Sequence, residues 1–183
     1  DLAIGVPFED LGTVTDAGVV HVLYARGVGI SSAKDDFWHQ NKPSVPETPE
    51  FFDHFGRAVA AGDFNGDGFD DLAIATDENS GEGSVMILYG AANGLVIGGN
   101  QVLGNALGTD NFGFALAVGD FDNDGFDDLA VGEPSDDINF QSSAGSVSVF
   151  YGSGPGLGAE VQFFYQQQGF IGDLLEAGDS FGT

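Results

Sequence analysis

The sequence has no cysteine and few basic residues: its 183 residues include 4 lysines and arginines against 29 aspartates and glutamates. The absence of cysteine excludes disulfides, zinc–thiolate sites and cysteine nucleophiles. The formal net charge of −25 argues against nucleic acid or an anionic membrane surface as a partner. No apolar run approaches the roughly 18 residues that a membrane span requires, so we expect no membrane insertion.

What the sequence does contain is 30 glycines and an internal repeat. The pair Phe-Gly, the triplet Asp-Leu-Ala and an alternating apolar run that ends in tyrosine each occur three times. In both complete copies Asp-Leu-Ala begins 16 residues after Phe-Gly (55 to 71 and 112 to 128), whereas the other connections vary in length, as surface loops do. The Phe-Gly pairs begin at Phe55, Phe112 and Phe181, and the Asp-Leu-Ala triplets begin at Asp1, Asp71 and Asp128. The alternating runs end at Tyr24, Tyr89 and Tyr151.

The pattern of apolar and turn-forming residues in the repeat predicts an all-β fold. Short apolar or alternating segments at 114–118, 129–132, 146–151 and 161–166 are separated by glycine, proline, asparagine and aspartate, and no 3.6-residue period is sustained. Four short strands per unit are typical of β-propeller blades. We therefore expect an incomplete propeller segment of about 2.5–3 blades. The expected units are a partial blade at 1–54 with a long connection at 31–54, a complete blade at 55–111, and a blade plus the start of the next repeat at 112–183.

Each complete unit contains an acidic loop, DFNGDGFDD from Asp63 and DFDNDGFDD from Asp120. Oxygen-bearing side chains fall at positions 1, 3, 5 and 9, a glycine at position 6 allows a sharp turn, and position 7 can offer its carbonyl. This is the layout that a hard divalent cation requires, and an all-oxygen donor set favours Ca²⁺ over Mg²⁺. The alternative is a solvated turn, which two loops in register disfavour. The expected ligands are Asp63, Asn65, Asp67, Phe69 and Asp71 in the first loop, and Asp120, Asp122, Asp124, Phe126 and Asp128 in the second.

These motifs resemble the FG-GAP repeat of integrin α-chain propellers. The resemblance rests on the Phe-Gly pairs, the acidic loops, and a Gly-x-Pro triplet at 5–7 and 132–134, which Ala75-Thr76-Asp77 replaces in the middle unit. It implies calcium loops between the first and second strands of a blade, all on one face of the propeller. Position 12 is Ile74 or Val131 rather than glutamate, so the loops are not EF-hands.

Two further features of the sequence leave alternatives open. The connection at 31–54 contains the only tryptophan, Trp38, and the phenylalanines Phe37, Phe51 and Phe52. These rings either belong to a loop that binds a partner or plug the propeller periphery or the neighbouring blade. The residues at position 8, Asp70 and Asp127, are expected to point outward or to cap backbone amides.

The function expected from these features is that of a calcium-binding, extracellular or cell-surface propeller segment without catalytic residues. It would act in adhesion or as a structural scaffold, for instance as a subunit of a polymeric surface assembly. Its expected partners are a protein or polysaccharide ligand, or further copies of itself that bind through open blade edges. The alternative is an accessory propeller of a secreted enzyme that acts on polysaccharide or phospholipid, with its catalytic part outside this chain.

Overall fold

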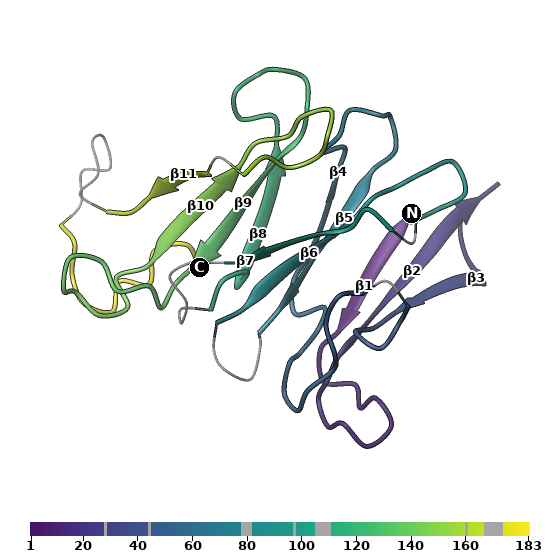
Figure 1. Ribbon diagram of the computed structural model, residues 1–183, viewed down its shortest axis with the longest axis horizontal. Helices are drawn as coiled ribbons and strands as arrows, with labels where there is room; N and C mark the ends of the chain where they lie inside the picture. Colours follow the sequence, from purple (N-terminus) through teal and green to yellow (C-terminus); the bar gives the residue numbers. More distant parts are fainter. Residues whose placement is uncertain are drawn as a thin grey trace.

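The computed structural model describes residues 1–27, 29–43, 45–77, 82–96, 98–104, 111–159, 161–166 and 174–183. Within those ranges the protein is all β: three antiparallel sheets lie side by side in chain order, and no helix occurs (Figure 1). The first sheet has the order β1-β2-β3 and the other two are four-stranded meanders, β4-β5-β6-β7 and β8-β9-β10-β11. This confirms the expected fold class of antiparallel propeller blades.

The strands are short, as the repeat predicts. Those expected in the last unit are present, with ends that differ by at most two residues. The eleven strands of the described ranges are β1 (Leu2–Val6), β2 (Val19–Arg26), β3 (Gly29–Trp38), β4 (Val59–Gly62), β5 (Asp71–Thr76), β6 (Ser84–Leu88), β7 (Gln101–Gly104), β8 (Ala115–Gly119), β9 (Asp128–Glu133), β10 (Ser146–Phe150) and β11 (Val161–Phe164). The division of the chain into units at 54/55 and 111/112 stays a prediction.

One expectation was wrong: residues 31–38 belong to β3 and not to the connection before the middle blade. They pair with β2, with Phe37 opposite His21 and Trp38 opposite Val20. The segment Ser-Ser-Ala-Lys-Asp-Asp has low intrinsic β-propensity, and its strand conformation depends on a neighbouring strand that presents unpaired backbone groups. The connection to the middle sheet therefore begins after Trp38.

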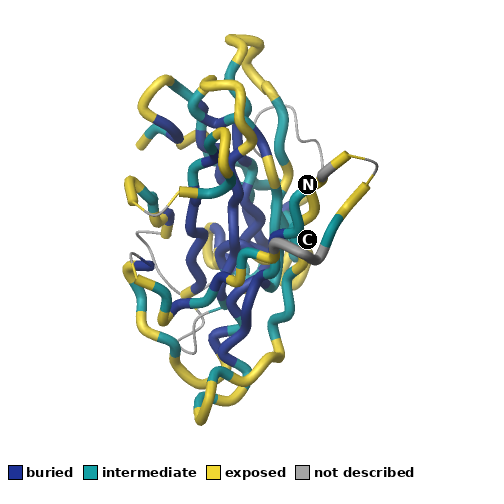
Figure 2. Tube along the Cα trace, turned by 90° about the vertical axis from the view of Figure 1, so that its right-hand side faces the viewer, coloured by how far each residue is buried: buried dark blue, intermediate teal, exposed yellow. Residues whose placement is uncertain are grey.

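The hydrophobic core lies between the sheets. All six residues of β5 are buried because the first and third sheets lie on either side of the middle sheet (Figure 1). Side chains of a strand alternate between its faces. Accordingly Leu72 and Ile74 pack with Trp38 of the first sheet, and Ala73 and Ala75 pack with the third sheet. Figure 2 shows this buried centre between exposed loops at both ends of the strands.

Each Phe-Gly pair joins its unit to the sheet before it. The backbone N–H of Phe55 donates to the carbonyl of Ala17 at 2.9 Å, and Phe181 makes the same 2.9 Å bond to Ala144. A glycine follows each acceptor, and a Cβ on Gly18 or Gly145 would lie 2.3 or 2.2 Å from the carbonyl oxygen of that phenylalanine. These glycines were not among the residues expected from the sequence to matter, although each stands directly before an alternating run.

The glycine of Gly-x-Pro completes the same joint. A Cβ on Gly5 would lie 1.9 Å from the carbonyl oxygen of Gly56, and one on Gly132 would lie 1.8 Å from that of Gly182. The middle unit has Ala75 at this position, and the corresponding bond from Phe112 to the carbonyl of Glu82 is longer, at 3.4 Å. The glycine therefore permits a close backbone approach between neighbouring units.

Candidate metal centres

The two acidic loops occupy equivalent places in two neighbouring sheets. The first connects β4 to β5 and the second connects β8 to β9, so each joins the first and second strands of its four-stranded sheet. Both begin directly after a short strand and end at an aspartate that starts the next one. This common position agrees with the loop placement that the repeat implies.

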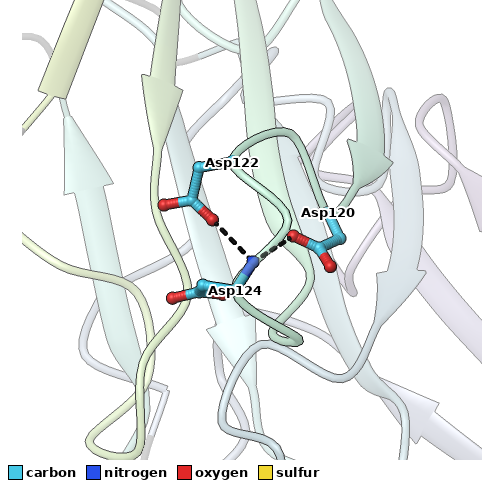
Figure 3. Close-up of side chains that lie close together, drawn as sticks. All are labelled: Asp120, Asp122 and Asp124. Atoms are coloured by element: carbon cyan, nitrogen blue, oxygen red, sulfur yellow. Dashed lines mark hydrogen bonds between the residues drawn. The ribbon is translucent and has the colours of Figure 1, made fainter.

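Backbone amides hold the carboxylates of the second loop in a converging arrangement. The N–H of Asp124 donates to Oδ1 of Asp120 at 3.0 Å and to Oδ1 of Asp122 at 3.1 Å (Figure 3). The N–H of Gly125 donates to Oδ2 of Asp120 at 3.1 Å, and that of Phe126 donates to Oδ1 of Asp124 at 3.0 Å. The turn therefore directs three carboxylates towards one point rather than into solvent separately.

The first loop has the same four hydrogen bonds. The N–H of Asp67 donates to Asp63 at 3.0 Å and to the side-chain oxygen of Asn65 at 2.9 Å. The N–H of Gly68 donates to Asp63 at 2.8 Å, and the N–H of Phe69 donates to Asp67 at 2.9 Å. The replacement of aspartate by Asn65 leaves this geometry unchanged, because the amide oxygen accepts in the same place.

The convergence has the dimensions of a cation site. Carboxylate oxygens of Asp120, Asp122 and Asp124 lie within 4.8 Å of one another. Two oxygens that each contact one Ca²⁺ at 2.3–2.6 Å can be at most about 5 Å apart, so the three can share an ion. Although Asp122 is exposed, its pKa is raised by partial desolvation and then by the negative charges of Asp124 and Asp128. The loop thus concentrates negative charge that a cation would neutralise.

The aspartates at position 9 have a different environment from the other expected ligands. Asp71 is 1% exposed and Asp128 is fully buried. Oδ2 of Asp71 accepts from the N–H of Phe64 at 3.1 Å, and its Oδ1 accepts from the N–H of Gly90 at 2.8 Å. Each carboxylate thereby ties the start of its loop to the turn after the third strand of the blade.

The second unit repeats this bridge. Oδ2 of Asp128 accepts from the N–H of Phe121 at 2.7 Å, and its Oδ1 accepts from the N–H of Gly152 at 2.8 Å. A carboxylate has about four lone-pair sites, so two amide contacts leave capacity for a cation. Asp71 and Asp128 therefore each fasten their loop to the turn after the third strand of the same sheet.

Burial also changes the acidity of Asp71. Burial raises its pKa to about 6; the hydrogen bonds from Gly90 and Phe64 act in the opposite direction, and the negative charges of Asp67 and Asp63 add to the increase. Burial therefore outweighs the effect of the two amide donors on this pKa. A bound divalent cation would favour the ionised form of this carboxyl group.

The remaining expected residues differ between the two loops. Phe69 is 42% exposed and Phe126 is half-buried, and the role of their carbonyls as ligands stays a prediction. Asp70 is exposed and has no hydrogen bond to a described residue, whereas Oδ2 of Asp127 accepts from the N–H of Asp63 at 2.9 Å. The expectation that residues at position 8 point outward or cap amides is confirmed, with one outcome in each loop.

The aromatic cluster around the connection divides into a buried and an exposed part. Trp38 is 1% exposed and packs between the first two sheets, with Lys42 Nζ 3.7 Å from its ring centroid. Phe37, Phe51 and Phe52 are 40%, 52% and 49% exposed. Of the two alternatives for this region, packing between blades holds for Trp38.

Comparison with known proteins gives one family and a set of relatives. The sequence model of the FG-GAP repeat matches residues 55–88 and 112–150. Integrin alpha-7 of Mus musculus is 34% identical over 145 residues, which are 74% of this chain and 11% of the relative. Integrin alpha ina-1 of Caenorhabditis elegans is 30% identical over 151 residues, 74% of the chain and 13% of the relative.

A relative of another kind matches equally well. Phosphatidylinositol-glycan-specific phospholipase D of Mus musculus is 32% identical over 140 residues, 73% of this chain and 16% of the relative. The chain thus spans 11–16% of the length of these curated relatives.

Proposed function

The chain is built from FG-GAP repeats and is similar to integrin α chains, and from this premise we propose that it is a calcium-binding segment of an extracellular β-propeller. In the proposal it acts in adhesion or as a structural scaffold at the cell surface or in a matrix. Ca²⁺ is the cofactor, and its role is to stabilise the loops rather than to take part in a reaction. A subunit of a polymeric surface assembly is one form of this function.

The observation that carries the proposal is the convergence of carboxylate oxygens in the second loop, within 4.8 Å of one another. The same amide-to-carboxylate pattern in the first loop supports it, because an accidental acidic turn would not be reproduced atom for atom in a neighbouring unit. Every donor is oxygen, which favours calcium or magnesium over softer metals. The carboxylate-rich set favours calcium, because magnesium retains most of its waters.

Thermal unfolding with and without calcium tests this function. Binding to the folded state alone is worth about 1–3 kcal/mol per site when calcium is well above its Kd. For a chain of this size, two sites raise Tm by about 4–24 °C over the value in EDTA. Asp122→Ala supplies the control, since it removes one exposed carboxylate of the second loop and should abolish part of the calcium-dependent increase. An equal Tm in EDTA and in millimolar calcium would refute calcium binding.

An extracellular location is proposed because calcium there is abundant enough for sites of modest affinity. No helix of the described residues is long and apolar enough to cross a membrane.

The partner we propose is a basic protein or a polysaccharide bridged by cations, or further copies of the chain. With a net charge of −25, nucleic acid is not proposed as a partner. Sedimentation velocity with and without calcium tests self-association, and a single species of monomer mass in both would exclude it.

The second candidate function is that of an accessory propeller beside a catalytic domain. The similarity to a phospholipase D supports it. We propose that the segment itself has no catalytic role: His21 and His54 bond to Asp35 and Asp77, and no hydrogen bond of a described residue links a histidine to a hydroxyl group. Incubation of the chain with a phosphatidylinositol-glycan lipid should release no phosphatidic acid, and release would overturn this proposal. Sequence that flanks residues 1–183 in the gene separates the two candidates.

A further inference from the structure

The second acidic loop contacts the first directly. The N–H of Asp63 donates to Oδ2 of Asp127 at 2.9 Å, and the N–H of Asp127 donates in return to the carbonyl of Asp63 at 3.1 Å. The N–H of Ser153, in the turn after β10, donates to the carbonyl of Phe64 at 3.1 Å. The third sheet therefore holds the first two residues of the neighbouring loop by three hydrogen bonds.

A close van der Waals contact accompanies these bonds. A Cβ on Gly66 would lie 2.5 Å from Cε1 of Phe126, so the ring rests against the bare backbone of the first loop. The second loop has Asn123 at the corresponding position, and Asn123 is exposed. This explains why the loops differ at position 4: glycine is required where a neighbouring ring approaches, and asparagine is accepted in the second loop, where no described ring approaches.

The contact joins residues that matter for cation binding in both loops. Asp63 is the first expected ligand of the first loop. Asp127 lies between Phe126 and Asp128, two expected ligands of the second. A cation that restrains these two residues also restrains Asp127, and through it the backbone of Asp63.

We infer that Asp127 is a positioning residue that couples the two cation sites, so that occupation of the second loop increases the calcium affinity of the first. The inference rests on the proposed calcium function. Because coupling between two binding equilibria is reciprocal, occupation of the first loop increases the affinity of the second by the same factor. Propeller blades would then acquire calcium together rather than one at a time.

Electrostatics acts in the opposite direction. A cation in the second loop reduces the negative potential that attracts a cation to the first, and screening limits this effect beyond a Debye length of about 8 Å at physiological ionic strength. The carboxylate of Asp127 also adds attraction of its own. A variant that keeps the hydrogen bond but removes the charge separates these effects, and Asp127→Asn does so because its amide oxygen can accept from Asp63.

The experiment is a calcium titration of the full chain followed by NMR, with the amide signals of Gly68 and Gly125 as separate reporters of the two loops. Asp127→Ala removes the acceptor and should weaken calcium binding at the first loop about tenfold, within the usual range of coupling between sites. Asp127→Asn should weaken it by only about twofold, because the amide oxygen keeps the bond in a weaker, neutral form. Asp70→Ala is the matched control: it changes the same loop position where the carboxylate has no partner among the described residues.

A double-mutant cycle isolates the coupling. Asp124→Asn weakens the second site; it should also weaken the first site in the unmutated chain, and should have no effect there once Asp127 is alanine. Equal first-loop affinities in Asp127→Ala and Asp127→Asn would overturn the inference and leave the calcium function intact. Calcium-independent signals of both glycines in the unmutated chain would overturn the proposed function, and the coupling with it.

Discussion

Replacing Asp128 by alanine separates a structural role of this residue from its role as a cation ligand. Asp128 is fully buried, and its two oxygens accept from the amides of Phe121 and Gly152 at 2.7 and 2.8 Å. The substitution leaves both donors without an acceptor. It also frees the loop from the turn after β10. We expect the folded state to lose stability even when no cation is bound.

The size of the effect follows from these two bonds. A buried donor left without a partner costs about 1–3 kcal/mol. Relief of the desolvation of one buried charge and entry of water reduce the sum, which leaves about 2–4 kcal/mol. For a chain of 183 residues this corresponds to a decrease in Tm of about 5–15 °C.

The assay is thermal unfolding by circular dichroism in EDTA, so that cation binding does not contribute. Asp122→Ala is the control in the same loop: the residue is exposed, and its removal lessens the repulsion among three carboxylates. In EDTA its Tm should equal that of the unmutated chain or exceed it slightly. In calcium both variants should lose part of the metal-dependent increase.

The result that would refute this reasoning is an unchanged or higher Tm of Asp128→Ala in EDTA. In that case the buried carboxylate would be held in the blade by the cation alone, and its two amide bonds would make no net contribution to folding. Asp71→Ala provides an independent repetition, because Asp71 makes the equivalent bonds to Phe64 and Gly90.

Two predictions concern the joints between units. Gly132→Ala places a Cβ 1.8 Å from the carbonyl oxygen of Gly182, and this backbone clash should lower the stability by about 3 kcal/mol. In the control Gly104→Ala the new Cβ meets no atom within 4 Å, so Tm should change little. Equal melting temperatures of the two variants would contradict the close approach. Trp38→Ala removes a side chain buried between the first two sheets and should lower the free energy of unfolding, measured in urea, by about 3–5 kcal/mol. Phe37→Ala, at a 40% exposed position, is the control. A loss in Trp38→Ala no larger than in this control would show that the tryptophan ring does not join the sheets.

The local features of this protein can be predicted from its sequence. Alternating apolar residues, turn glycines and the odd-numbered oxygens of the acidic loops act over a few residues, so their pattern predicts strands and loops directly. The repeat of these patterns predicts successive blades of one kind. For the same reason the strands of the last unit were predicted within two residues of their observed ends.

The repeat pattern does not predict the contacts between units. Phe64 and Phe121 occupy the same position of the two loops, yet Phe64 is fully buried and Phe121 is 51% exposed, because the third sheet covers only the first loop. The strand at 29–38 likewise depends on pairing with β2.

The sequence by itself therefore determined the all-β repeat and the candidate ligands, since both depend on residues close together along the chain. The tertiary structure alone decided which of those carboxylates are buried in the blade, which glycines receive a neighbouring backbone, and which aspartate reaches the next loop. The physical reason is that these properties depend on the packing of one sheet against another, through contacts between residues far apart in the chain.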